Sequence, residues 1–276
     1  MQDGDMPVPE VAAKAISTFS EIAWHVAIRD AQRIIEEGSR SGITAIGITA
    51  SGYPARLRII SDAPVVIYVK GNVDVLARDA IAVVGTRNVS AAGTRLAKLI
   101  AGYVARRGYV VVSGLALGVD SLAHEAALEA NALTVAVLAH GLDTVASTSH
   151  RKLAERILAS GGTLMSEHHH GVPARPQEFV RRNRLQSGLS IGSIVVESGI
   201  VGGSMHHARF TKNQGRHLFA PLASSAASRG DLDESGALEL IDKLGAIPIR
   251  TLGDLGRELD RIKSQPTPVI APVDLF

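Results

Sequence analysis

Short apolar runs alternate along this chain with longer segments in which apolar residues recur every three or four positions. The apolar runs predict strands at 44–48, 64–69, 81–85, 110–114, 134–139, 163–167, 193–198, 217–221 and 246–249. The periodic segments predict helices at 8–39, 91–107, 121–130, 150–159, 181–188, 203–214 and 235–244, with a loop at 173–179. Strands that are apolar throughout and alternate with helices indicate a parallel sheet covered on both faces.

We therefore expect an α/β fold with an extended Rossmann-like, doubly wound and mostly parallel sheet. The predicted organisation is a helical N-terminal region at 1–42, the Rossmann-like domain at 43–250, and a C-terminal helix with a Pro-rich tail at 251–276. Residues 1–8 are expected to be disordered and the tail extended. In such sheets ligands bind at the carboxyl ends of the strands, so the residues that follow each strand are the candidates for function.

Three of these strands, at 81–85, 110–114 and 193–198, run into a helix through a glycine-rich junction. Ser113 and Gly114 are followed by Gly118 and Asp120, which predicts a helix N-terminus that cradles a phosphate, or else a packing turn that Asp120 caps. After the strand at 81–85, Arg87 stands where a dinucleotide fingerprint has its second glycine. This residue favours an arginine clamp on a phosphate, the alternative being a capped turn with a solvated arginine.

Arginines are also concentrated near the predicted helix at 181–188. Arg181, Arg182 and Arg184 lie between apolar neighbours, which indicates that the basic run is anchored to the fold. Arginines beside strand ends are suited to gather phosphodiesters. The predicted phosphate-binding residues are Gly85, Thr86, Arg87, Ser113, Gly114, Arg181, Arg182, Asn183, Arg184, Gly203, Ser204 and Lys212.

Composition narrows the possible function classes. The absence of cysteine excludes disulfides, thiolate metal sites and a Cys nucleophile, and the net charge of +2 requires any basic surface to be local. No apolar run approaches the ~20 residues of a membrane span, so we expect a cytoplasmic protein without membrane contact. Adjacent histidines at 168–170 and 206–207 point in different directions, so neither a metal nor another cofactor is expected. An Asp120–His124 pair lacks an accompanying nucleophile, and no catalytic residue is assigned.

The chain resembles the DNA-processing protein A (DprA, also called Smf) family over about residues 50–250. The resemblance rests on ordered blocks at 53–57, 69–72, 82–87, 113–120, 123–124, 141–143, 166–167, 179–190, 195–197, 203–204 and 215–216. It implies a non-enzymatic, dimeric Rossmann-like protein that binds single-stranded DNA and assists a RecA-type recombinase in transformation. Under this resemblance Arg87, Ser113, Gly114, Arg182 and Arg184 are candidates for phosphate contact.

The chain departs from the family pattern at 144–153 and at 204–208. We therefore expect a divergent member that lacks the C-terminal winged-helix domain. One alternative is an antitoxin-like regulator in an anti-phage defence module with a toxin partner. Another is a nucleotide sensor or a phosphoribohydrolase-like enzyme, although the glutamate after the glycine-rich loop of those enzymes is absent. The tail residues Asp274, Leu275 and Phe276 resemble a peptide that docks on the replication sliding clamp, or else form an ordinary tail.

Overall fold

The structure, a computed structural model, describes residues 21–144, 148–225 and 229–264. The predicted disorder at 1–8, the first part of the predicted 8–39 helix and the candidate docking residues Asp274, Leu275 and Phe276 lie outside these ranges. Within them, no helix has both the length and the apolar character that crossing a membrane requires.

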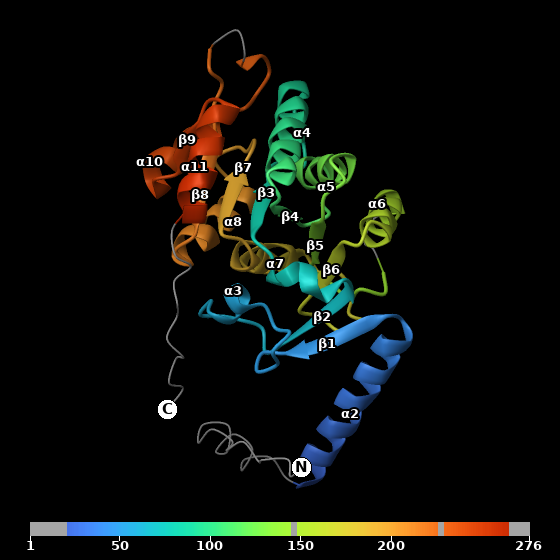
Figure 1. Ribbon diagram of the computed structural model, residues 1–276. Coiled ribbons are helices and arrows are strands. Elements are labelled where there is room, and N and C mark those ends of the chain that lie inside the picture. Colours follow the sequence, from blue (N-terminus) through green and yellow to red (C-terminus); the bar gives the residue numbers. More distant parts are fainter. Residues whose placement is uncertain (1–20, 145–147, 226–228, 265–276) are drawn as a thin grey trace.

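A nine-stranded sheet forms the centre of the described chain (Figure 1). Its strands lie in the order β1-β2-β6-β5-β4-β3-β7-β8-β9. β2 pairs antiparallel with β1 and with β6, and all strands from β6 to β9 are parallel to their neighbours. The strands are β1 (Ile43–Gly47), β2 (Val66–Gly71), β3 (Ala80–Val84), β4 (Val110–Ser113), β5 (Thr134–Leu138), β6 (Thr163–Ser166), β7 (Gly192–Val195), β8 (His217–Pro221) and β9 (Ile247–Ile249). The predicted mostly parallel, Rossmann-like sheet is confirmed.

Helices cover both faces of the sheet, as a doubly wound fold requires. One layer contains α4 (Ala91–Arg106), α5 (Val119–Glu129), α6 (Thr148–Ala159) and α11 (Leu252–Ser264). The other contains α7 (Pro176–Leu189), α8 (Gly203–Asn213) and α10 (Ser235–Leu244), together with the short α3 (Ala55–Arg58). A 3-10 turn, η1 (Val73–Ala77), leads from β2 to β3.

Side chains of β3 show why this strand is apolar at every position. Ile81 and Val83 pack into the core cluster beneath α4 and α5, whereas Ala80 and Ala82 pack into the cluster on the opposite face, with α7. Because successive side chains of a strand point to opposite faces, a strand covered on both sides has no position that faces solvent. The same cluster beneath α4 includes Leu255 and Leu259 of α11, so this last helix is part of the core.

The predicted loop at 173–179 is wrong in its second half, because α7 begins at Pro176. Proline is well placed in a first helical turn, where its missing N–H has no partner to lose and its fixed φ already suits a helix. Glu178 in the same turn also complements the positive end of the helix dipole. The predicted helix at 181–188 is therefore longer than expected, and it carries Phe179 at a defined position.

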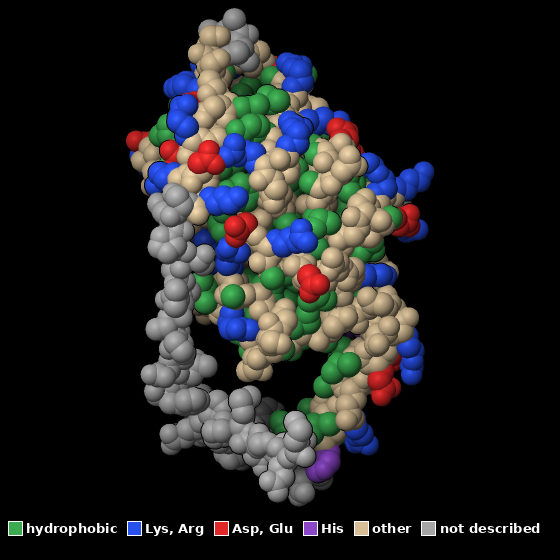
Figure 2. Space-filling model, viewed as in Figure 1, with side chains coloured by type: hydrophobic (Ala, Val, Ile, Leu, Met, Phe, Trp, Pro, Cys, Tyr) green, Lys and Arg blue, Asp and Glu red, His purple; other side chains and the backbone are tan. Residues whose placement is uncertain are grey.

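Helix α2 (Glu21–Arg40) extends away from the sheet (Figure 1). One side of it carries apolar side chains and the other carries charged ones (Figure 2). Its C-terminal end is held to the body through β1 and through a contact of 2.8 Å between His170 Nε2 and Glu37 Oε2. This contact lowers the pKa of the Glu37 carboxyl. The part of α2 nearer its N-terminus is exposed between Trp24 and Arg33.

Candidate functional site

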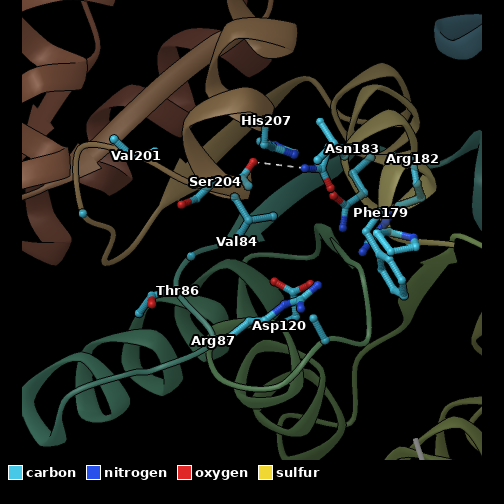
Figure 3. A pocket seen from close by; sticks show the side chains of 18 residues that line it. Val84, Thr86, Arg87, Asp120, Phe179, Arg182, Asn183, Val201, Ser204 and His207 are labelled. Carbon is cyan, nitrogen blue, oxygen red and sulfur yellow. Dashed lines mark hydrogen bonds between the residues drawn. The ribbon is translucent and has the colours of Figure 1, made fainter. Parts of the chain in front are cut away.

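A pocket of about 560 Å³ opens where the strand order changes direction, between β3 and β7 (Figure 3). From β3 the sheet continues through β4 and β5 to β6. From β7 it continues in the opposite direction, through β8 to β9. Such a switch point, at the carboxyl ends of the strands, is where open α/β sheets bind ligands. The lining residues come from the loops after β3, β4 and β7 and from helices α7 and α8; they include Gly85, Thr86, Arg87, Asp120, Phe179, Arg182, Asn183, Gln186, Gly203, Ser204 and His207.

Arg182 is the most unusual side chain of this pocket. It is only 4% exposed, yet its Nε and Nη1 atoms have no hydrogen-bond partner among the described residues. Burial lowers the pKa of its guanidinium to about 10, against the opposing attraction of Asp120. A buried donor without a partner carries an uncompensated desolvation cost, which an acceptor entering the pocket would remove. Arg182 is therefore a donor group prepared for an anionic ligand.

Asp120 lies near Arg182 and holds the loop that follows β4. Burial raises the pKa of its carboxyl, and the neighbouring charge of Arg182 acts in the opposite direction. Its Oδ2 atom accepts a hydrogen bond of 3.0 Å from the backbone N–H of Gly114. The sequence analysis considered Asp120 as a helix cap; the structure shows it bracing Gly114.

Gly114 allows Arg182 to lie against the end of β4. A Cβ atom at this position would lie 1.4 Å from Arg182 Nη1, so no other residue leaves the guanidinium where it is. The neighbouring Ser113 is fully buried, and its hydroxyl donates to the carbonyl of Val83 at 2.7 Å. Ser113 therefore links β4 to β3, while Gly114 makes room for the cation.

The N-terminus of α8 forms another wall of the pocket, at Gly202, Gly203 and Ser204. Within the part of the chain that the structure describes, no side chain caps this helix, whereas α4 is capped by the Ser90 hydroxyl and by Asp231, which accepts from Ala91 and Ala92. The Asn183 side chain donates to the carbonyl of Gly203 at 3.1 Å and so fixes the helix start next to α7. An uncapped helix N-terminus offers backbone N–H groups and a positive dipole end to an anion.

Arg87 and Phe179 lie at the opening of the same pocket. The Arg87 guanidinium carbon lies 5.4 Å from the centre of the Phe179 ring, within the range of a cation–π contact. Thr86 donates its backbone N–H to Glu197 at 2.7 Å and accepts from Asn88 through its hydroxyl, which shapes the turn that presents Arg87. Both Arg87 and Phe179 also line a second cavity of about 150 Å³ after β4 and β5.

Several predicted site residues are not brought into this pocket. Arg184 is buried and forms two hydrogen bonds to Glu167, of 3.0 and 2.7 Å, and a further ion pair with Asp62. Arg181 is exposed and lines a different cavity of about 510 Å³. Lys212 is exposed at the far end of α8, about 14 Å along the helix from Gly203.

Gln186 and His207 also line the pocket, and neither was predicted as a site residue. Gln186 follows Arg182 by four positions on α7, a spacing that puts both on one helix face and that was available in the sequence. Its Nε2 atom has no hydrogen-bond partner among the described residues. His207 is buried next to Ser193, and burial lowers its pKa to about 3, so this side chain is neutral at physiological pH.

The histidines at 168–170 have structural partners. His168 lies 3.2 Å from Glu178, and these two side chains with Glu167 have potential ligand atoms within 4.8 Å of one another. Folding therefore brings an acidic residue, Glu178 of α7, beside the histidines. Both carboxylate oxygens of Glu167 already accept from Arg184, however, so we assign this group a structural role.

Comparison with known proteins identifies relatives of this chain. A family model for DNA recombination-mediator protein A matches residues 44–260. The chain is 42% identical over 168 residues to Protein Smf of Escherichia coli strain K12, covering 61% of this chain and 45% of that protein. It is 34% identical over 228 residues to the DNA processing protein DprA of Bacillus subtilis strain 168, covering 82% of this chain and 75% of that protein. The chain thus spans about half the length of the first of these relatives.

Two solved structures have the same fold. DNA processing protein A from Streptococcus pneumoniae superposes with a TM-score of 0.70 at 32% identity, covering 78% of this chain and 74% of that one. DNA processing protein A from Helicobacter pylori, which has a distinct mode of binding single-stranded DNA, superposes with a TM-score of 0.69 at 27% identity. That match covers 79% of this chain and 96% of the other.

Proposed function

Because the chain belongs to the DNA recombination-mediator protein A family, we propose that it binds single-stranded DNA in the pocket between β3 and β7. The family consists of DNA-processing proteins and not of enzymes, so the prediction that the chain is not an enzyme is confirmed by family membership. The observation that carries the proposal is the buried Arg182, two of whose nitrogens have no partner among the described residues, in the same pocket as the uncapped start of α8.

A phosphodiester of the DNA backbone fits this pair of features. Guanidinium donors and helix N-termini both bind phosphate oxygens without reading the base sequence. In our proposal one phosphate lies between Arg182 and the backbone N–H groups at Gly203 and Ser204. Arg87 then holds a neighbouring phosphate at the opening, while Phe179 offers its ring to a base.

Oligo(dT) binding measured against salt concentration tests this proposal. We expect affinity to fall with salt, with a slope of about −0.7 per phosphate contact on a single strand. Arg182→Met and Arg87→Ala should each weaken binding and reduce the slope by about 0.7. Arg78→Ala is the matched control, because this arginine is also exposed but lies before the amino end of β3. Arg87 follows the carboxyl end of the same strand.

Two outcomes would contradict the proposal. Wild-type protein that does not bind oligo(dT) at low salt would overturn it outright. Displacement of the DNA by low concentrations of a mononucleotide would favour the nucleotide-sensor alternative, since a pocket of about 560 Å³ has the volume of a small-ligand site. A panel of nucleoside monophosphates without effect would support a polymer as the ligand.

We further propose, from the family's role in recombination, that the bound strand is delivered to a RecA-type recombinase. Stimulation of recombinase ATPase activity on an oligonucleotide by wild-type protein, and its loss with Arg182→Met, would support this step. The predicted homodimer, toxin partner, clamp contact and cytoplasmic location stay predictions, as does phosphate contact by each individual residue.

A further inference from the structure

Large apolar side chains are exposed around the mouth of the pocket. Twelve large apolar side chains are exposed among the described residues; four of them lie on α2, and Ile59, Val65, Leu99 and Leu238 are scattered. The remaining four, Leu117, Val180, Ile200 and Val201, lie on segments that border the pocket and the adjoining cavity. Single exposed apolar residues are ordinary, but a group of them at one site marks an interaction surface. We name these four residues the apolar rim.

Each member of the apolar rim is placed by an element that also supplies a pocket wall. Ile200 and Val201, which are 60% and 85% exposed, lie on the loop from β7 to α8 between Gly199 and Gly202. Val180 follows Phe179 on α7, and Val180 and Val201 both line the pocket. Leu117, 58% exposed, lies on the loop between β4 and α5 and lines the adjoining cavity next to Arg87. Figure 3 shows Val201 and Phe179 on opposite sides of the opening.

The rim and the floor of the pocket have complementary chemistry. The interior of the pocket, which we call its floor, contains Arg182 and the start of α8, and both suit an anion. The apolar rim contains uncharged aliphatic side chains. A single strand presents phosphates on its backbone and unstacked bases beside them, so it matches both parts at once. A duplex presents the same phosphates, but its bases are stacked and paired and their faces are inaccessible.

We propose that the apolar rim binds the faces of unpaired bases and gives the site its preference for single strands over duplex. This inference rests on the proposed function, since the phosphate contact in the pocket positions the bases. Ile200 and Val201 stand clear of the body, since both side chains are exposed and a Cβ added at the following Gly202 or Gly203 would meet nothing within 4 Å. The rim adds affinity for bases and leaves phosphate binding to the floor.

An abasic oligonucleotide separates the two contributions. The experiment measures binding of wild-type protein and of the double variant Ile200→Ser, Val201→Ser to oligo(dT), to an abasic backbone of equal length, and to a blunt duplex. We expect the double variant to lose about five- to tenfold in affinity for oligo(dT). Its affinity for the abasic strand and its salt slope should stay at the wild-type values, because the phosphate contacts are intact.

Matched controls keep the test specific. Val65→Ser and Leu238→Ser remove aliphatic side chains that are 72% and 56% exposed elsewhere on the surface, and both should bind all three DNAs like the wild type. Thermal unfolding of each variant checks that the fold is retained.

The inference would be overturned if the double variant bound oligo(dT) like the wild type. That result is expected if the apolar rim binds a protein partner instead of DNA bases. Equal losses on oligo(dT) and on the abasic strand would also overturn it, because the rim would then act on the backbone. Failure of the proposed function is distinguishable, since in that case the wild type binds none of the three DNAs and Arg182→Met changes nothing.

Discussion

Arg182 and Arg184 lie two positions apart on α7 and are similarly buried, but their surroundings are opposite. Arg184 is held by Glu167 and Asp62, whereas Arg182 has two nitrogens without a partner among the described residues and lies near the charge of Asp120. Residues that are two positions apart on a helix point about 200° apart. The arginines of one basic run therefore reach different environments. One arginine stabilises the fold, and the other is available to a ligand.

We expect Arg182→Met and Arg184→Met to separate stability from binding. Arg184→Met leaves Glu167 buried without its partner and should lower the free energy of unfolding by about 3–5 kcal/mol. Arg182→Met removes donors that are unsatisfied. Burial already raises the pKa of the Asp120 carboxyl, so this carboxyl can take up a proton when the arginine is removed. Chemical denaturation and oligo(dT) binding measure the two effects. Greater destabilisation by Arg182→Met than by Arg184→Met would contradict the assignment.

Gly114→Ala should weaken DNA binding although it adds only a methyl group. The new Cβ would occupy the position of Arg182 Nη1, so the guanidinium must leave its place over β4. We expect a lower Tm together with reduced affinity for oligo(dT). Gly52→Ala, where a Cβ would meet nothing within 4 Å, serves as the control and should leave both values unchanged.

The sequence predicts which strand–helix turns form the site. It does not predict which side-chain atoms in those turns are available to a ligand. The glycine-rich turns after β3, β4 and β7 follow from the apolar runs that end there, and the structure brings all three to one pocket. The sequence could not separate Arg182 from Arg184, because both satisfy the same basic pattern. It also favoured Ser113 as a phosphate contact, whereas the hydroxyl is used between two strands that pair only in the folded sheet.

At the scale of elements, the helix N-termini of the pocket edge are not equivalent. Ser90 and Asp231 occupy the start of α4, and Asp120 lies in the first turn of α5, whereas α8 begins with two glycines and no side-chain cap. A capped terminus has already satisfied part of its backbone N–H groups and its dipole. Unlike α4, α5 and α7, helix α8 begins with neither a side-chain cap nor an acidic residue in its first turn among the described residues, which suits it to an added anion.

Ser204→Asp should have opposite effects on stability and on function. A carboxylate in the first turn of α8 complements the helix dipole and should raise Tm slightly, but it competes with a phosphate for the same N–H groups. We expect weaker oligo(dT) binding. Lys212→Gln, at the other end of the same helix, should bind oligo(dT) like the wild type. A loss of affinity as large as that of Ser204→Asp would place the DNA along α8 and contradict phosphate binding at the helix N-terminus.

The cap that Asp231 provides to α4 should depend on pH. Hydrogen bonds from the backbone N–H groups of Ala92 and Ala91 hold the pKa of its carboxyl below the ordinary value of 3.8. A lowered pKa in the folded state means that the cap stabilises the fold above pH 3.8 and loses this effect as the pH falls through the folded value. Thermal unfolding of Asp231→Ala should show a constant deficit in Tm between pH 5 and 7. That deficit should shrink below about pH 4, and a deficit independent of pH would argue against a charged cap.

At the scale of the whole molecule, the pocket and helix α2 lie in different parts of the fold. α2 contacts the body through β1 and His170, whereas the pocket is built around the carboxyl ends of β3, β4 and β7. The net charge of +2 is also small, so attraction to DNA depends on where the cations are placed. The strand periodicity predicted this sheet, but no local pattern predicts how far α2 stands from it.

Removal of residues 1–40 should therefore leave DNA binding intact. We expect oligo(dT) affinity within about twofold of the full chain, because distant and independent parts of a protein contribute additively. Anisotropy titration measures the affinity, and circular dichroism reports whether the sheet is retained. A truncated protein that is folded but has lost binding would show that the N-terminal region takes part in the site.

Pairing of β3 with β7 also determines when the pocket can form during synthesis. Ile81 pairs with Gly192, so the two walls come together only after more than a hundred further residues have been made. Until then β3 is an edge strand with one row of backbone groups unpaired, and an apolar edge of this kind promotes aggregation. Nascent chains that stop before residue 192 should thus be insoluble and unable to bind DNA, and the slowest folding step should be the insertion of β7 beside β3.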